Sequence, residues 1–518
     1  MRLNELRTRT DSLMDRGVEA GSQALTRVPR QVFDVLVMMT GAVVLLYLFV
    51  NKNHYYAIGF VVVLFAVLFL MRRPVLLSYS LFALIPIYWV NLLGRSLRVI
   101  TVLTLIGFAY YFVVVVVRRK IPRYNTVFLA FGLYLFTCAY SLLNSVMIVG
   151  ASWPGMKYFL LALALFSVLV VSIEDRNQIK WLFVIFIAWG VLESILGAMQ
   201  TFVSPKFYIA RTWVSIIDAY SVGGVRRASG TFQIGPRYAM FLMGPLAIVV
   251  AGMLSGRVLK RRTWALLLVP FVVGIFVSLT RIAIALSFFY ILLFHVFERR
   301  RQAVLASIAG LLVAVVMVGA ITMAIPDDAR RALAQRFSDK DDEVYMDRLF
   351  FLWNALGAFT EHPVLGIGVG TYELRSWEFM QKYPVPWREL SWDVASQWNM
   401  PETVPVHNEY GRMLAEQGIF SVPIFLFLIY VALRNLLYAF RHTRDELIRL
   451  FSSGTAMYLA ALAIYWFFHE YFMEEPYISV TPFALSVILY NLVRKEQEKA
   501  DAAPPANSVP GELAAHRP

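Results

Sequence analysis

Long apolar runs recur along this chain and constrain its fold more than any other feature. Each run has about 17 to 25 residues, the length that crosses a bilayer as an α-helix. The runs lie at 32–50, 55–71, 74–93, 99–117, 125–147, 155–173, 179–202, 238–255, 263–279, 281–297, 303–324, 419–435, 453–472 and 477–493. The sequence therefore predicts an all-α polytopic membrane protein with about 12–14 transmembrane helices.

The composition supports this fold class. Of 518 residues, 59% are hydrophobic and only 16% are charged, so the chain has too little polar surface for a soluble globule of its size. The single cysteine, Cys138, lies inside an apolar run and cannot form an intramolecular disulfide. We attribute the net charge of +14 to membrane topology and not to a nucleic-acid surface.

The distribution of Lys and Arg predicts the orientation, because these residues accumulate in cytoplasmic loops. The N-terminal leader carries six arginines and is placed inside the cell. Alternation of the runs then places the other basic clusters on the same side: Arg72–Arg73, Arg118–Lys120, Arg257, Lys260–Arg262, Arg299–Arg301, Arg434, Arg441, Arg444 and Arg494–Lys495. We expect both termini to be cytoplasmic.

These signals divide the chain into five segments. We expect a cytoplasmic leader at 1–31, eleven transmembrane helices within 32–324, a large outer loop at 325–418, further transmembrane helices within 419–495 and a disordered cytoplasmic tail at 496–518. A shorter outer loop lies at 203–237. Helical spacing of apolar residues in 345–359 predicts that the large loop contains helices of its own.

Several arginines are exceptions to the accumulation of Lys and Arg in cytoplasmic loops, because the predicted topology places them outside. Arg211, Arg226, Arg227 and Arg237 lie in the shorter outer loop, and Arg281 lies in a very short outer turn. An arginine at the outer rim is costly unless it is paired or useful, and guanidinium groups bind phosphate oxygens in pairs. Arginines at this leaflet would therefore suit a pyrophosphate head group. The alternative is that they snorkel to ordinary lipid phosphates.

The predicted topology leaves four histidines outside, namely His54, His362, His407 and His469. His407 is the best placed of them, because we expect it to open a helix that descends into the membrane. A neutral imidazole can accept a proton from a sugar hydroxyl. Asn408, Tyr410, Glu416 and Gly418 share the segment and are expected to support His407. The alternative is that His407 is an ordinary structural residue.

Four motifs along the chain, at 227–232, 278–281, 362–370 and 407–421, resemble the signatures of bacterial O-antigen ligases. His407-Asn408, nine residues and Gly418-Ile419-Phe420-Ser421 is similar to the family's histidine signature, although Ser421 replaces a glycine. The stretch 362–370 (HPVLGIGVG) is similar to its His-Pro segment, and 227–232 (RASGTF) to its Arg-x-x-Gly-Thr-Phe segment. The turn 278–281 (SLTR) resembles the arginine turn before the next helix.

This superfamily comprises O-antigen ligases and Wzy-type polysaccharide polymerases, which have a GT-C membrane fold and need no metal or other cofactor. The resemblance implies inverting transfer of a glycan from undecaprenyl pyrophosphate to an acceptor hydroxyl at the periplasmic face of the bacterial inner membrane. His407 would act as base or orienter. Arg227 and Arg281 would stabilise the departing pyrophosphate, with Arg348 and Arg237 as further ligands.

The sequence leaves three alternatives open. A ligase would use lipid A core as acceptor, as in lipopolysaccharide biosynthesis, whereas a polymerase would extend a polysaccharide such as an exopolysaccharide. The histidine signature favours the ligase, and the altered glycine and the number of helices favour the polymerase. A transporter or flippase of lipid-linked glycan is the non-enzyme alternative, which predicts charged residues buried mid-helix. Glu193 is the main example of such a residue here.

Overall fold

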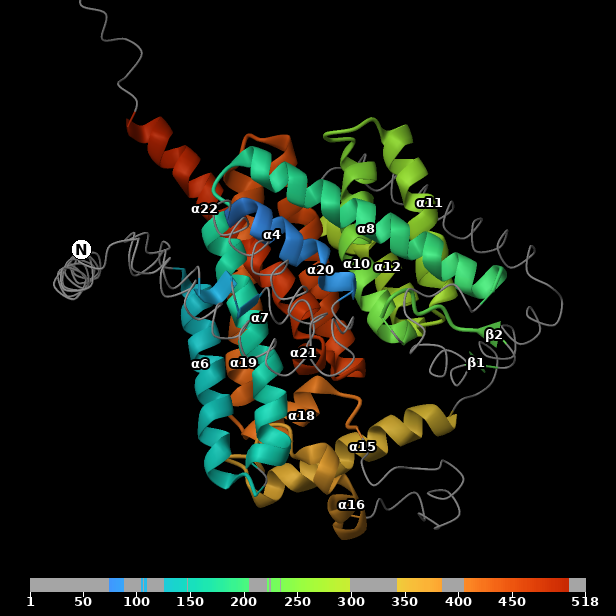
Figure 1. Cartoon of the computed structure of the whole chain (residues 1–518), viewed down its shortest axis with the longest axis vertical. Helices are drawn as coiled ribbons and strands as arrows, with labels where there is room; N and C mark the ends of the chain where they lie inside the picture. The colour runs from blue at the N-terminus through green and yellow to red at the C-terminus, as the bar shows by residue number, and fades with distance from the viewer. Residues whose placement is uncertain are drawn as a thin grey trace, which may run out of the picture.

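The computed structural model describes residues 74–87, 104–105, 107–109, 125–146, 148–204, 221–222, 225–232, 234–298, 342–383 and 405–502. These residues are almost entirely helical (Figure 1). The helices are α4 (Pro74–Ala83), α6 (Thr126–Ser141), α7 (Trp153–Ser172), α8 (Arg176–Phe202), α10 (Gly235–Ser255), α11 (Arg261–Val277), α12 (Arg281–Glu298), α15 (Asp342–Glu361), α16 (Tyr372–Lys382), α18 (Glu409–Gln417), α19 (Ser421–His442), α20 (Glu446–Phe468), α21 (Tyr471–Glu474) and α22 (Pro476–Ala502).

Short irregular elements complete the described chain. They are the turns η1 (Ile85–Ile87), η2 (Leu142–Asn144) and η3 (Ile148–Ser152), and the two-residue strands β1 (Ser221–Val222) and β2 (Val225–Arg226), which pair antiparallel. The leader, the expected spans at 32–50, 55–71 and 303–324, and Arg211 lie outside the described residues.

Six described helices are long and apolar enough to cross a membrane: Thr126–Asn144, Arg176–Phe202, Gly235–Ser255, Ser421–His442, Glu446–Phe468 and Pro476–Asp501. Two shorter apolar helices accompany them, Phe159–Ser172 and Arg281–Val296. An all-α, multi-pass membrane protein is thus confirmed, while the expected total of helices involves residues that the structure does not describe. Helix α22 also continues to Ala502, so residues 496–502 are helical where we expected a disordered tail.

Helices α10 and α20 form the centre of the bundle. Helix α10 is preorganised at its start by Pro236 and ends at Gly256, whose positive φ of 67° is the left-handed conformation that glycine adopts without strain. Its side chains are buried along nearly the whole length. Gly454 of α20 faces Ile248, where an added Cβ would lie 2.8 Å from the Ile248 Cα atom, so the small residue lets the two helices approach closely.

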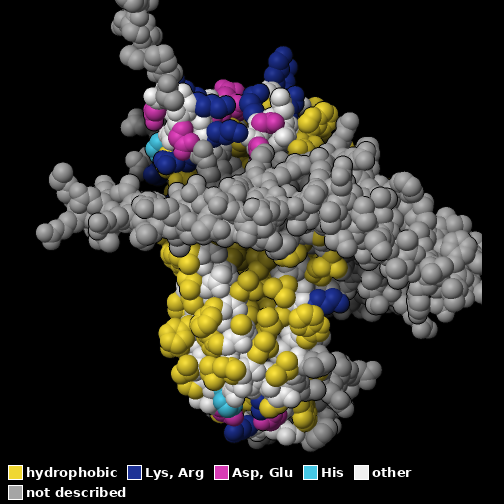
Figure 2. Space-filling view, turned by 60° about the vertical axis from the view of Figure 1, so that its left-hand side comes forward, with side chains coloured by type: hydrophobic (Ala, Val, Ile, Leu, Met, Phe, Trp, Pro, Cys, Tyr) yellow, Lys and Arg dark blue, Asp and Glu magenta, His cyan; other side chains and the backbone are white. Residues whose placement is uncertain are grey.

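The peripheral helices expose apolar side chains, as a lipid-facing surface requires. Examples are Phe136 of α6 at 64% exposure and Tyr430 of α19 at 60%. Figure 2 shows hydrophobic side chains over the described surface between two ends where charged side chains gather. In Figure 1 the α10–α11 connection and the end of α22, which carry predicted cytoplasmic clusters, lie opposite α15, α16 and α18.

Helices α15, α16 and α18 pack together at the other end of the bundle, and we call them the α15–α18 layer. This layer has a small core of its own, made of Ala355, Ala358, Ile367, Tyr372, Phe379, Val406 and Ala415. The helix predicted at 345–359 is confirmed as α15. Helix α18 does not descend into the bundle itself, because the chain breaks at Gly418 and the spanning helix α19 begins at Ser421.

Candidate active site

The two histidine motifs of the sequence pack against each other through their backbones. The amide N–H of Ile367 donates to the Ala415 carbonyl at 2.9 Å, and that of Ile419 donates to the Pro363 carbonyl at 2.9 Å. Gly418 has a φ of +76°, and an added Cβ would lie 2.1 Å from the Val364 carbonyl oxygen. The glycine of this motif is therefore required for the close approach of the two segments.

Ser421, which replaces the last glycine of the signature, has a structural role at the same corner. It is fully buried, and its hydroxyl hydrogen-bonds the Gly418 carbonyl at 2.6 Å and the Met413 carbonyl at 3.0 Å. These carbonyls belong to the end of α18, where helical hydrogen bonds run out. The departure from the family pattern thus fits the local fold.

The arginine motif at 227–232 packs against the turn at 278–281. The Arg227 Nε–H donates to the Ser278 carbonyl at 3.2 Å, and the Ala228 amide donates to the Val277 carbonyl at 2.9 Å. The turn contains Leu279 at a φ of +50°, an uncommon conformation for a residue with a side chain. Two arginines from distant segments are thereby brought to one place, Arg227 beside the turn and Arg281 directly after it.

The same motif accounts for Glu193, the charged residue inside a predicted span. The Glu193 carboxylate accepts hydrogen bonds from the Thr231 amide at 3.0 Å and from the Thr231 hydroxyl at 2.8 Å. Gln200, which follows Glu193 on α8, accepts hydrogen bonds from the amides of Ser229 and Gly230. Glu193 and Gln200 therefore hold the arginine motif in place.

A cavity of about 830 Å³ lies where these motifs meet. Its lining includes every arginine proposed as a pyrophosphate ligand, together with the proposed catalytic histidine: Arg227, Arg237, Arg281, Arg348 and His407. In the order given, these five residues come from the loop before α10, the first turn of α10, the start of α12, helix α15 and the loop before α18. All five are half-buried. These residues, which lie far apart in the sequence, converge on one cavity as predicted.

His407 lies two residues before α18 in a left-handed backbone conformation with a φ of +55°. Such a conformation costs on the order of 1–3 kcal/mol for a residue with a side chain and persists only where the surroundings determine it. The ring packs against Phe351 at 5.7 Å between centroids. Burial, and secondly the positive charge of Arg348, lower the pKa of His407 to about 4. The imidazole is therefore neutral at physiological pH.

Arg237 is held by carboxylates on the cavity wall. Its Nε lies 2.6 Å from the Glu475 Oε1, and its Nη2 lies 3.1 Å from the Glu474 Oε2. The guanidinium carbon also stacks 5.6 Å from the ring centre of Tyr471. The charge of Arg237 is thus shared with two acids, which limits its availability to a ligand.

Residues 265–426 match a family model described as O-antigen ligase. A search of curated proteins found no match. The predicted resemblance to the O-antigen ligase and polymerase superfamily is thereby confirmed.

The matched segment contains three of the five cavity residues that the sequence predicted, namely Arg281, Arg348 and His407. Arg227 and Arg237 lie before it in the chain but contribute to the same cavity. The cavity is therefore built from the matched segment and from flanking parts of the chain on both sides.

The four residues predicted to support His407 do not line the cavity in the described structure. Asn408 caps α18 by accepting from the Gly411 amide at 2.8 Å, and its Nδ2 donates to the Phe467 carbonyl. The Tyr410 hydroxyl donates to the Ala463 carbonyl at 2.7 Å. Glu416 accepts from the Tyr372 amide at 3.1 Å, joining α18 to α16. With Gly418, these residues fix α18 and so the loop that carries His407.

A set of cavity residues at the junction of α20 and α21 was not predicted as part of the site. His469, Glu470, Tyr471 and Glu474 all line the cavity. The predicted span at 453–472 included three of them, whereas α20 ends at Phe468. The run His469 to Glu475 carries one histidine and three acids within seven residues, and this density of polar groups was the available signal.

His469 is a second neutral imidazole in the cavity. It is 7% exposed, and its ring lies parallel to that of Tyr471, with 5.1 Å between centroids and an interplanar angle of 4°. Burial lowers the pKa of His469 well below its usual range, and the charges of Arg348 and neighbouring groups act in the same direction. The ring is therefore uncharged, like that of His407.

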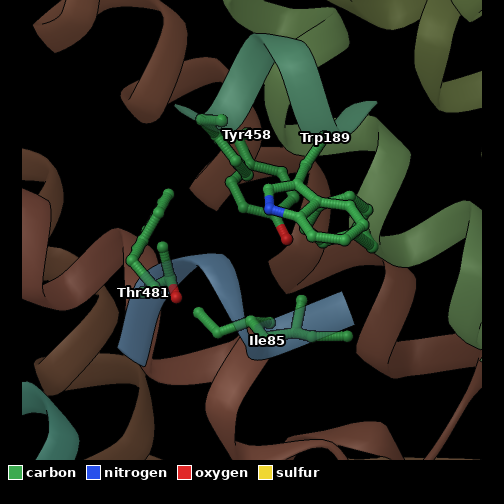
Figure 3. A pocket seen from close by; sticks show the side chains of 8 residues that line it. Ile85, Trp189, Tyr458 and Thr481 are labelled. Carbon is green, nitrogen blue, oxygen red and sulfur yellow. The ribbon is translucent and has the colours of Figure 1, made fainter. Parts of the chain in front are cut away.

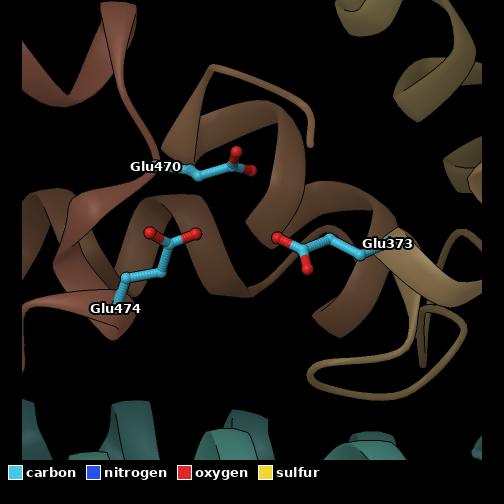
Figure 4. Close-up of side chains that lie close together, drawn as sticks. All are labelled: Glu373, Glu470 and Glu474. Carbon is cyan, nitrogen blue, oxygen red and sulfur yellow. The ribbon is translucent and has the colours of Figure 1, made fainter. Parts of the chain in front are cut away.

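Glu373, Glu470 and Glu474 form an acidic group on the cavity wall, with carboxylate oxygens within 4.8 Å of one another (Figure 4). Such a set could hold a cation. Its charge is already opposed by Arg237, paired with Glu474, and by the buried Arg412, whose Nη1 lies 3.8 Å from Glu474. Burial raises the pKa of Glu373 and that of Glu470, and the Glu474 charge adds to both effects.

Two other cavities are apolar and unsuited to the chemistry. One lies enclosed among Ile85, Trp189, Tyr458, Thr481 and neighbouring side chains (Figure 3). Its volume of about 10 Å³ is the space of a single water molecule. The other, of about 60 Å³, lies between α10, α11 and α12 and is lined by aliphatic and aromatic residues with Ser287. The large cavity alone among these three combines titratable and cationic groups.

Proposed function

We propose that the chain is a metal-independent membrane glycosyltransferase. It transfers a glycan from undecaprenyl pyrophosphate to an acceptor hydroxyl at the periplasmic face of the bacterial inner membrane. The observation that carries this proposal is the single cavity of about 830 Å³ that unites the imidazole of His407 with the guanidiniums of Arg227, Arg281 and Arg348. The match of residues 265–426 to the O-antigen ligase family model supports the reaction class.

The arginines provide the donor site of this proposal. Guanidinium groups match the oxygens of a pyrophosphate in geometry and charge. When the bond between the anomeric carbon and the phosphate oxygen breaks, its electron pair stays on the pyrophosphate, and the negative charge there grows. Arg227 and Arg281 stabilise that charge in the transition state. Arg348 adds to them from α15, and Arg237 contributes less because Glu474 and Glu475 already hold it.

His407 serves the acceptor. Its neutral imidazole accepts the proton of the acceptor hydroxyl while the hydroxyl oxygen forms the new bond to the anomeric carbon. A single displacement of this kind inverts the configuration at that carbon. The charge of Arg348 contributes to the low pKa of His407. A bound pyrophosphate opposes that charge, so donor binding raises the basicity of His407 in the complex.

The membrane arrangement follows from the same proposal. The α15–α18 layer and the rest of 325–418 form a periplasmic loop, the leader 1–31 and the tail after α22 are cytoplasmic, and the whole chain has a GT-C-like architecture. Cys138 is buried, so native labelling by a maleimide is low. Single cysteines introduced at Glu378 in α16 and at Glu498 in α22 test the sidedness. Periplasmic labelling of position 498 would reverse the orientation.

Purified protein incubated with a lipid-linked repeat unit, with and without lipid A core, tests the function. A ladder of longer lipid-linked chains identifies a polymerase. Transfer that requires lipid A core identifies a ligase. Absence of any transfer, with movement of the donor across reconstituted vesicles, would replace the proposal with the transporter or flippase.

A further inference from the structure

The loop that carries His407 is joined to the α20–α21 junction by hydrogen bonds to Glu470. The Val406 amide donates to the Glu470 Oε2 at 3.0 Å, and the His407 amide donates to the Glu470 Oε1 at 3.3 Å. One carboxylate thus accepts from two consecutive backbone N–H groups. A carboxylate held in this way fixes the direction of both peptide planes.

A second carboxylate completes the junction from the other side. Glu409, in the first turn of α18, accepts from the Phe472 amide at 3.1 Å. Each of the two segments therefore supplies a carboxylate to the backbone of the other. Glu409 is also bound by Arg412 at 2.8 Å, and it is fully buried. The loop before α18 is consequently fixed on both sides of His407.

The backbone of His407 needs such support. Its φ of +55° is left-handed, and a histidine adopts this conformation only where its surroundings determine it. In an extended conformation the peptide planes on either side would turn, and the side chain would leave its present direction into the cavity. Glu470 accepts from the N–H groups of the two peptide units that precede the His407 Cα atom, while Glu409 holds the chain after it. Glu470 is 3% exposed, so water does not replace these bonds readily.

We propose that Glu470 is a positioning residue for His407, holding the left-handed turn at residue 407 and so directing the imidazole into the cavity through the backbone N–H groups of Val406 and His407. The proposal rests on the proposed function of His407. Glu470 also belongs to the acidic group of the cavity, but its role in this proposal is exerted through the backbone and needs no bound cation.

Substitutions at Glu470 separate positioning from donor binding. Glu470→Gln keeps one acceptor oxygen and places an NH₂ against the other N–H, whereas Glu470→Ala removes both acceptors. We expect kcat to fall about 10- to 100-fold in Glu470→Gln and further in Glu470→Ala, because small displacements of a reacting group have effects of this size. The KM for the lipid-linked donor stays within about twofold, since the arginines are unchanged. Glu378→Gln, at an exposed position of α16, is the matched control.

Two further measurements distinguish this role from a general loss of structure. Combined with His407→Gln, the Glu470→Gln change adds little to the loss of kcat, because the two residues act as one unit. The reaction of His407 with diethyl pyrocarbonate, followed by peptide mass spectrometry with His362 as reference, changes at least about threefold in Glu470→Gln. This second readout does not require activity.

Unchanged labelling of His407 together with an unchanged kcat in Glu470→Gln would overturn the proposal. Additive losses in the double variant would also do so. If instead His407→Gln alone turns over as the wild type does, the function assigned to His407 fails, and labelling of His407 in Glu470→Gln still decides whether the carboxylate positions the ring.

Discussion

Two groups of charged residues line the same cavity and differ in how they are held. The arginine group, Arg227, Arg281 and Arg348, comes from three segments far apart in the chain. The acidic group, Glu373, Glu470 and Glu474, faces Arg237 and Arg412 and binds backbone amides near His407. In the proposed function the arginines bind the donor, whereas Glu470 holds the backbone beside the proposed base His407.

The largest effect is expected at the residue that both groups surround. His407→Ala removes the base and should lower kcat about 10²- to 10⁴-fold, with the protein still present in the membrane at wild-type level. Donor KM changes little, because the arginine group is intact. Chain length of the glycan product on gels, together with initial rates, measures the effect. Wild-type product from His407→Ala would remove His407 from the mechanism.

The next largest effect distinguishes ligand-binding arginines from structural ones. Arg227→Ala or Arg281→Ala should weaken binding of the lipid-linked donor about 10- to 100-fold, the usual cost of losing a charged hydrogen-bonding partner of a bound anion. Arg375→Ala is the control, because Arg375 pairs with Glu378 on α16 away from the cavity lining. Donor affinity equal to that of the control would mean that both arginines contact ordinary lipid.

A smaller effect concerns pH. The free protein's His407 has a pKa of about 4, so kcat/KM for the donor should decline only as pH falls toward that value. With pyrophosphate bound, the pKa is higher, and kcat should decline at a higher pH than kcat/KM does. Both quantities decline toward low pH because a base loses activity when it is protonated. If kcat and kcat/KM declined at the same acidic pH, the charge of the bound donor would have no effect on the pKa of His407.

The smallest effect is expected from chelation. If the acidic group is neutralised by Arg237 and Arg412, transfer should continue in EDTA at a rate within about twofold of the untreated protein. Dependence on added Mg²⁺ or Mn²⁺ would instead make Glu373, Glu470 and Glu474 a metal site. The three acids would then take part in the reaction together with the arginines.

Much of the arginine group could be predicted from the sequence, but little of the acidic group could. Arg227, Arg281 and His407 could be found because each is a cation or imidazole at the outer rim of an apolar segment, whereas Arg348 was named only with the family resemblance. The helices could be found because apolar length is a strong signal. The helix α15 and the glycine turn after it followed from spacing and turn residues.

The remaining features depend on tertiary contacts. Residues 469–472 were assigned to the predicted span at 453–472, whereas the break of α20 at Phe468 is fixed by tertiary packing. The bonds from residues 406 and 407 to Glu470 join positions that no periodicity relates. The helix expected to begin at His407 was also wrong in detail, since His407 precedes the capping residue Asn408 and has a left-handed backbone.

Protection of His407 by the donor tests the central claim most directly, because it asks whether the imidazole and the arginine group meet one ligand. The measurement is the rate at which diethyl pyrocarbonate modifies His407, with and without lipid-linked pyrophosphate donor, in wild type, Arg227→Ala and Arg281→Ala. We predict that the donor slows modification in the wild type and fails to do so, at the same concentration, in both arginine variants. Equal modification of wild-type His407 with and without saturating donor would contradict the account.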